Sequence, residues 1–173
     1  MTGGAAIRVG ILEGQPGYHS TERIGGFQDA IGGSAFAVVS SLDDKWNTEG
    51  GNTAAMDMLQ AHPDIQLIFA ANDYMIMGAQ LAAKALGKTD LVLLGNDGDT
   101  AALEEIAAGN LTATGNTSPF VMGQMALAVT TDVLDGTFPA GWVEMPTTIV
   151  DENNVLAVLQ NPDALDPKPA NAD

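Results

Sequence analysis

Short apolar runs alternate with amphipathic stretches along most of the chain. Runs bounded by turn residues predict β-strands, and apolar positions with helical spacing predict α-helices. The expected strands cover residues 7–12, 35–42, 65–71, 91–94, 111–115 and 147–150, and the expected helices cover residues 21–31, 52–61, 74–86, 100–108 and 118–134. Ser20 is the expected N-cap of the first helix. This alternation predicts an α/β fold in which a parallel sheet carries helices on both faces.

Polar residues collect where the expected strands end. The strand exits contain residues 15–20, 43–47, 72–73, 96–97 and 116–117. Ligands of open α/β sheets bind beyond the carboxyl ends of the strands, so these exits form one candidate rim. Amides, carboxylates, an arginine and a tryptophan suit a polyhydroxylated ligand, because they supply donors, acceptors and an apolar ring face.

Each rim residue also has a purely structural interpretation. Asp73 is more readily a helix N-cap than a ligand contact, and Asn72 is equally well a turn residue. Asp97 beside Gly98 suits a turn, Arg23 a solvated helix position and Trp46 a place in the core. The residues alone leave these alternatives open.

Charge and composition narrow the function classes. The net charge is −16 with six Lys and Arg residues, which disfavours nucleic acid and anionic membranes as partners. The chain has no cysteine, which excludes disulfides and thiol chemistry. No apolar run reaches the length of a membrane span, and the first residues lack the pattern of a signal peptide. We therefore expect either a cytosolic protein or a mature or truncated piece.

Catalytic and cofactor signatures are largely missing from the sequence. It contains no GxGxxG, GxxxxGK[ST], GxSxG or HExxH motif, and His19 and His62 do not have metal-ligand spacing. We expect no cofactor and no enzymatic activity. The best enzyme hypothesis is a Mg²⁺-dependent phosphohydrolase whose acidic rim consists of Asp43, Asp44, Asp73 and Asp97.

Several segments taken together resemble a known family. They are "GILEGQPGYHSTERIGGFQDAI", "HPDIQLIFAANDYMIMGA" and "LVLLGNDGDTAALEEIAAGNLTAT". In this order they resemble the type I periplasmic sugar-binding proteins of ABC transporters, the ribose-binding group. The resemblance runs from about residue 8 to residue 155.

This resemblance implies a Rossmann-like, flavodoxin-type lobe, the second of two that clamp a sugar. Residues 1–117 are then the sugar-binding C-terminal lobe, and residues 118–138 a helix that packs on the N-terminal lobe, which we expect to be missing here. Residues 139–158 are a return segment that completes the C-terminal lobe, and residues 159–173 a flexible tail.

The resemblance also assigns ligand-binding residues. Arg23 matches the sugar-binding arginine, Trp46 the aromatic on the sugar ring, and Asp97 the carboxylate that accepts hydroxyl protons. Asn72 matches an amide contact, which leaves Asp73 as the expected helix cap. Two further positions, Asn96 and Thr117, differ from the aromatic residue and the glutamine that are common in the family.

The implied partners are a monosaccharide or polyol and, through the parent protein, an ABC transporter permease. The parent is expected to be periplasmic, or extracellular and lipid-anchored. The isolated chain is expected to form a homodimer, because the 118–134 helix has a broad apolar arc. The lactose-repressor-type transcription regulators share the implied fold and remain the alternative, although the acidic charge and the "EGQPG" and "DDKW" segments favour the transport group.

Overall fold

A six-stranded sheet forms the centre of the molecule. The computed structural model describes residues 6–138, 141, 143–145 and 147–161. The strand order is β2-β1-β3-β4-β5-β6. The strands are β1 (Ile7–Leu12), β2 (Phe36–Leu42), β3 (Leu67–Ala70), β4 (Val92–Asp97), β5 (Ala113–Asn116) and β6 (Thr148–Asp151). β1 to β5 pair in parallel, whereas β6 pairs antiparallel to β5, so the predicted parallel sheet is correct except at this edge.

Helices follow the strands as predicted, but several boundaries differ. The helices are α1 (Tyr18–Ile31), α2 (Thr48–Ala61), α3 (Asp73–Ala85), α4 (Thr100–Ala107), α5 (Pro119–Leu134) and α6 (Val155–Gln160). Gly17 is the N-cap residue of α1, so the prediction that Ser20 caps this helix is wrong. The Ser20 hydroxyl donates instead to the Glu13 carbonyl at 2.6 Å.

The chain end also departs from expectation. Helix α6 was not predicted, and it includes residues 159 and 160, which were assigned to the tail. Val155 and Val158 bury this helix against the core, which explains why a short polar-flanked segment is helical. Residues 162–173 of the expected tail, and residues 139, 140, 142 and 146 of the expected return segment, lie outside the described residues.

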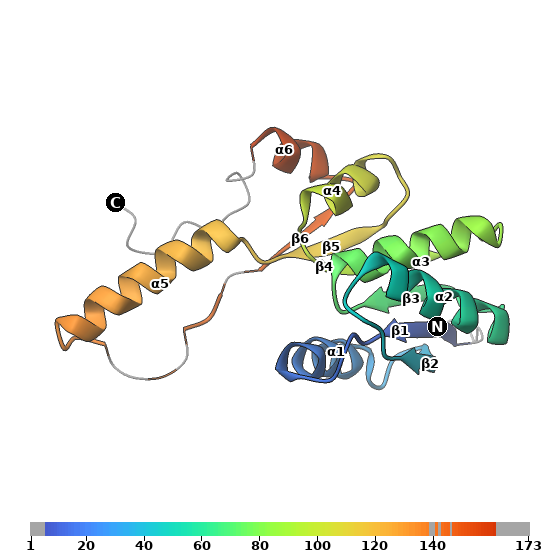
Figure 1. The fold of residues 1–173 in the computed structure, drawn as a ribbon, viewed down its shortest axis with the longest axis horizontal. Coiled ribbons are helices and arrows are strands. Elements are labelled where there is room, and N and C mark those ends of the chain that lie inside the picture. Colours follow the sequence, from blue (N-terminus) through green and yellow to red (C-terminus); the bar gives the residue numbers. More distant parts are fainter. Residues whose placement is uncertain (1–5, 139–140, 142, 146, 162–173) are drawn as a thin grey trace.

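The helices cover both faces of the sheet (Figure 1). On one face the Phe27 ring of α1 stacks on Phe69 of β3, with ring centroids 4.3 Å apart. On the other face Met58 of α2 lies against Gly10 of β1, and Ile76 of α3 lies against Gly95 of β4. α4 packs against α3, and α6 packs against α4. The predicted arrangement of helices on both faces is therefore confirmed.

Helix α5 extends away from this body (Figure 1). Val121 is its one buried residue. The Ser118 hydroxyl accepts a hydrogen bond from the Val121 backbone N–H, so the predicted start of the helix is correct. Within the described part of the chain, no helix combines the length and apolar character needed to cross a bilayer.

Candidate ligand pocket at the carboxyl ends of the strands

Residues from four strand exits meet in one small pocket. Its volume is about 200 Å³, and its lining residues are His19, Arg23, Trp46, Asn72 and Asp97. The pocket lies at the carboxyl ends of the parallel strands, where α/β folds bind ligands. Four predicted site residues are therefore neighbours, although they are far apart in the sequence.

Arg23 is held at the centre of the pocket by three acceptors. Its Nη2 lies 2.8 Å from Asp97 Oδ1, and its Nη1 donates to the Ala71 carbonyl at 2.8 Å. With its amide oxygen turned toward the guanidinium, Asn96 accepts from Arg23 Nε at 2.8 Å and Nη1 at 3.2 Å. The fixed fork of the guanidinium is thus oriented by the sheet before it meets any ligand.

Asp97 stands on a constrained backbone at the end of β4. Its φ is 142°, a value that side-chain-bearing residues rarely adopt. Burial raises the pKa of the Asp97 carboxyl above its usual value, and the Arg23 charge and hydrogen bond partly offset this. The half-buried carboxylate offers several acceptor positions beyond the one that Arg23 occupies.

Trp46 forms the aromatic wall of the pocket. Its φ is 60°, its backbone N–H donates to Asp44 Oδ1 at 2.9 Å, and its Nε1 donates to the Gln15 carbonyl at 3.3 Å. The ring lies on Gly14, where a Cβ would approach ring atoms to 2.4 Å. Only glycine at position 14 allows this ring position, and the half-buried Trp46 both packs on the core and faces the pocket.

The expected roles of Asn72 and Asp73 are partly reversed. Asn72 Oδ1 accepts the Met75 backbone N–H at 2.9 Å and so caps α3, while Asn72 Nδ2 donates to the Trp46 carbonyl at 3.3 Å. Asp73 is fully buried and does not cap the helix, so that prediction is wrong. Its side chain instead accepts hydrogen bonds from the loop after β4 and from β5.

The two remaining predicted residues do not line the pocket. Asn96 contacts it indirectly through Arg23, and the Thr117 backbone N–H donates to the Asp97 carbonyl at 3.1 Å. His19, in contrast, lines the pocket although it was not among the predicted site residues. His19 lies in the predicted polar strand exit at residues 15–20, and this position was the feature of the sequence that could have identified it as a site residue.

The acidic residues of the phosphohydrolase hypothesis do not converge. Asp73 is in the core, Asp97 pairs with Arg23, and Asp43 and Asp44 line a separate pocket of about 590 Å³. Among the described residues, no group of three or more His, Cys, Asp or Glu side chains could hold a metal ion. The predicted Mg²⁺-binding rim is therefore not formed.

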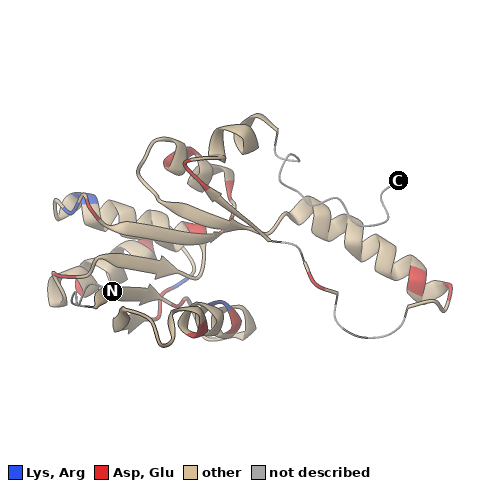
Figure 2. Cartoon of the chain, turned by 180° about the vertical axis from the view of Figure 1, so that it is seen from behind, with Lys and Arg blue, Asp and Glu red and all other residues tan. Residues whose placement is uncertain are grey.

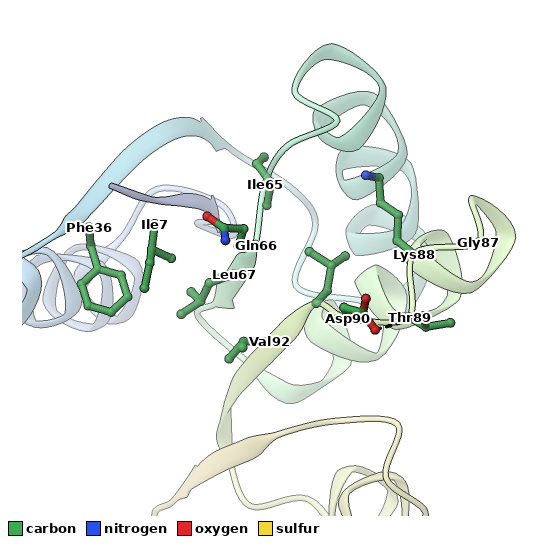
Figure 3. A pocket seen from close by; sticks show the side chains of 11 residues that line it. Ile7, Phe36, Ile65, Gln66, Leu67, Gly87, Lys88, Thr89, Asp90 and Val92 are labelled. Atoms are coloured by element: carbon green, nitrogen blue, oxygen red, sulfur yellow. Dashed lines mark hydrogen bonds between the residues drawn. The ribbon is translucent and has the colours of Figure 1, made fainter. Parts of the chain in front are cut away.

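A larger groove of about 660 Å³ lies at the opposite edge of the sheet. Figure 3 shows Ile7, Phe36, Leu67 and Val92, the first residues of β1 to β4, along this groove. Its lining combines apolar side chains with four polar ones, Gln66, Lys88, Thr89 and Asp90. Its position at the amino ends of the strands makes it the weaker candidate, because α/β sheets bind ligands at the carboxyl ends.

Comparison with known proteins agrees with this geometry. The ribose import binding protein RbsB of Bacillus subtilis is 37% identical over 134 residues, which cover 77% of this chain and 43% of that protein. The D-allose-binding periplasmic protein of Escherichia coli is 35% identical over 127 residues, covering 72% of this chain and 41% of that protein. The chain thus spans less than half the length of these relatives.

Solved structures show the same fold. An ABC transporter periplasmic solute-binding protein from Actinobacillus succinogenes, crystallised with bound D-allose, matches with a TM-score of 0.82 and 28% identity. The match covers 89% of this chain and 56% of that one. The family described as the periplasmic binding protein domain matches residues 1–137. The chain therefore belongs to the periplasmic binding protein domain family.

Proposed function

We propose that this chain is the C-terminal, ligand-binding lobe of the solute-binding component of an ABC sugar importer. The observation that carries the proposal is the pocket in which Arg23, Trp46, Asn72 and Asp97 converge with His19. The ligand is a monosaccharide or polyol, bound without covalent chemistry. The names of the relatives, which include ribose and D-allose binding proteins, support this ligand class.

The pocket residues divide the work of recognising a sugar. Arg23 donates to hydroxyl oxygens, and Asp97 accepts hydroxyl protons. Asn72 retains one N–H and one lone pair after its bonds to Met75 and Trp46. The Trp46 ring offers an apolar face to the C–H side of a sugar ring. This combination binds a neutral polar molecule without placing a net charge opposite it.

We further propose that the parent protein docks on an ABC permease and works in the periplasm, or outside the cell on a lipid anchor. In this proposal residues 1–117 are the binding lobe, and residues 118–138 form the helix that packs on the other lobe. Residues 139–158 return to complete the binding lobe. We also propose that the 173-residue chain by itself forms a homodimer through α5.

An NMR titration of the full 173-residue chain tests the ligand proposal. D-ribose, D-allose and myo-inositol are added to ¹⁵N-labelled protein, and one of them should shift the amides around Arg23, Trp46, Asn72 and Asp97. The matched control is Asp97→Asn, since Asn tolerates positive φ better than Ala does. It should weaken binding about tenfold, because hydrogen bonds to a charged group are lost.

Two outcomes would argue against this function. Chemical-shift changes confined to amides of the amino-end groove around Val92 would show that sugar binds at the opposite edge of the sheet. Mg²⁺-dependent release of phosphate from sugar phosphates, without binding of any free sugar, would favour the phosphohydrolase hypothesis instead.

A further inference from the structure

The buried carboxylate of Asp73, at the exit of β3, joins the loop after β4 to strand β5. Its Oδ2 accepts the backbone N–H groups of Gly98 and Asp99, each at 2.8 Å. Its Oδ1 accepts the Thr114 hydroxyl of β5 at 2.6 Å. Asp73 is 0% exposed and does not line the pocket, so its charge is directed entirely at neighbouring parts of the protein.

These hydrogen bonds hold the backbone that directly follows Asp97. Asp97 and Gly98 have φ values of 142° and 86°, two successive positive values. Such a conformation persists only when the surroundings over-determine it. The two N–H groups that close on Asp73 Oδ2 belong to the next residues of this turn, so the carboxylate fixes the turn from beneath.

The sequence around the turn makes room for this carboxylate. Gly95 of β4 lies directly against it, and a Cβ at that position would come within 2.3 Å of Asp73 Oδ1. The network therefore requires a glycine, a threonine and two backbone donors, contributed by β4, β5 and the loop between β4 and α4. Burial raises the pKa of Asp73, and the Thr114, Asp99 and Gly98 donors partly offset that effect.

We propose that Asp73 is a positioning residue that fixes the ligand-facing carboxylate of Asp97. The proposal rests on the ligand pocket proposed above. Because Asp73 holds the backbone and not the Asp97 side chain, Asp97 keeps its place when ligand hydroxyls compete with Arg23 for its oxygens. The adjacent Asn72 caps α3 and contacts Trp46, so this pair of neighbours supports two walls of the pocket at once.

The test compares Asp73→Asn with Thr114→Val and with Leu59→Ala. Asp73→Asn replaces one acceptor oxygen by an amide that cannot accept, and Thr114→Val removes only the hydroxyl donor. Leu59 is buried in α2, so Leu59→Ala is a control for lost stability away from the turn. The readouts are hydrogen exchange and chemical shifts of the Gly98 and Asp99 amides, and the dissociation constant for D-ribose.

We expect Asp73→Asn to speed exchange at both amides, because a charged acceptor is lost, and to weaken D-ribose binding about tenfold, because the turn that carries Asp97 is no longer fixed. Thr114→Val should give a smaller change of the same kind. Leu59→Ala should lower the unfolding midpoint while leaving both amides and the affinity unchanged.

Unchanged Gly98 and Asp99 amides in folded Asp73→Asn would overturn the proposal, as would a loss of affinity no larger than that of an equally destabilised Leu59→Ala. If Asp73→Asn does not fold, Gly95→Ala decides the matter, because its methyl group displaces Asp73 Oδ1. If the unaltered chain binds no sugar, the proposed function fails, whereas the amide readouts still decide the role of Asp73.

Discussion

At the scale of single residues, the proposed function depends most on the ion pair between Arg23 and Asp97. Their side chains are 25% and 30% exposed, so solvent screens the ion pair, and its contribution to folding is about 1 kcal/mol or less. Replacing part of this pair by ligand hydroxyls therefore costs little stability. The Ala71 carbonyl keeps Arg23 in place during such an exchange.

Asp44 lines the separate pocket of about 590 Å³ and contacts Trp46, and its carboxylate is less well paired than that of Asp97. Its Oδ1 accepts the Trp46 N–H, but its buried Oδ2 has no hydrogen-bond partner among the described residues. Burial raises the pKa of Asp44, the Trp46 hydrogen bond lowers it, and the neighbouring Asp43 charge raises it further. The charged form of Asp44 is therefore costly for the folded chain.

We predict that Asp44→Asn stabilises the chain at about pH 7 by roughly 1 kcal/mol, because an unpaired buried charge is removed while the bond to Trp46 is kept. A carboxyl group whose pKa is raised in the folded state destabilises the fold when it is ionised. This destabilisation grows as the pH rises from the unfolded-state pKa, near 4, through the raised folded-state pKa. The advantage of the variant should therefore disappear at about pH 3, where Asp44 is protonated in both states. Urea unfolding across this range measures the difference.

Asp43→Asn is the matched control, since Asp43 is exposed and adjacent. Its effect should be much smaller. An Asp44→Asn effect of equal size at every pH would show that the charge is not its cause.

At the scale of elements, α5 stands apart from the rest of the molecule. Its exposed large apolar side chains are Phe120, Met122, Leu127, Val133 and Leu134. Figure 2 shows no Lys or Arg on this helix and acidic residues only near its far end. Phe120, Leu127 and Leu134 lie on one side of the helix and Met122 and Val133 on another, so the proposed dimer would cover exposed apolar side chains on more than one side of α5.

We predict that the chain is a dimer at low micromolar concentration and that Leu127→Glu makes it a monomer, because a charge would have to be buried in the contact. Light scattering coupled to size exclusion measures the mass. Gln60→Glu adds the same charge at an exposed position of α2, away from α5, and should leave the dimer intact. A monomer for the unaltered chain would contradict the proposed dimer.

At the scale of the whole molecule, the proposed function makes the pocket one half of a binding site. Its volume of about 200 Å³ is small for a site that encloses a sugar, and the chain spans 43% of the length of its Bacillus subtilis relative. Affinity depends on how fully polar groups are paired and water is excluded. A lobe that covers one side of the ligand therefore binds weakly.

We predict a dissociation constant for D-ribose of about 1 mM or weaker. At about 100 mM sugar, mass action then adds at most about 2.7 kcal/mol to the free energy of unfolding. Urea unfolding with and without D-ribose measures this gain, which should be smaller by up to about 1.4 kcal/mol in Asp97→Asn, because that variant binds about tenfold more weakly. A gain well above this limit would show that the chain encloses the sugar by itself.

The sequence by itself determined the order of strands and helices from β1 to β6, though not α6, and the edge of the sheet at which the polar residues gather. Those features depend on the local periodicity of apolar residues and on turn residues, and both can be recognised within one short segment of the sequence. The exits of the parallel strands share one edge, which brought Trp46, Asn72 and Asp97 into view, whereas Arg23 in α1 was assigned through the family resemblance.

Only the tertiary structure decided which polar residue caps a helix and which one holds a distant turn. Asn72 and Asp73 are adjacent and both suit a helix cap, but the partners of Asp73 are Gly98, Asp99 and Thr114, from 25 to 41 residues away. The antiparallel direction of β6 and the burial of α6 likewise depend on the elements they pack against. A hydrogen bond needs both partners within about 3 Å, and the fold alone brings donors from distant segments that close.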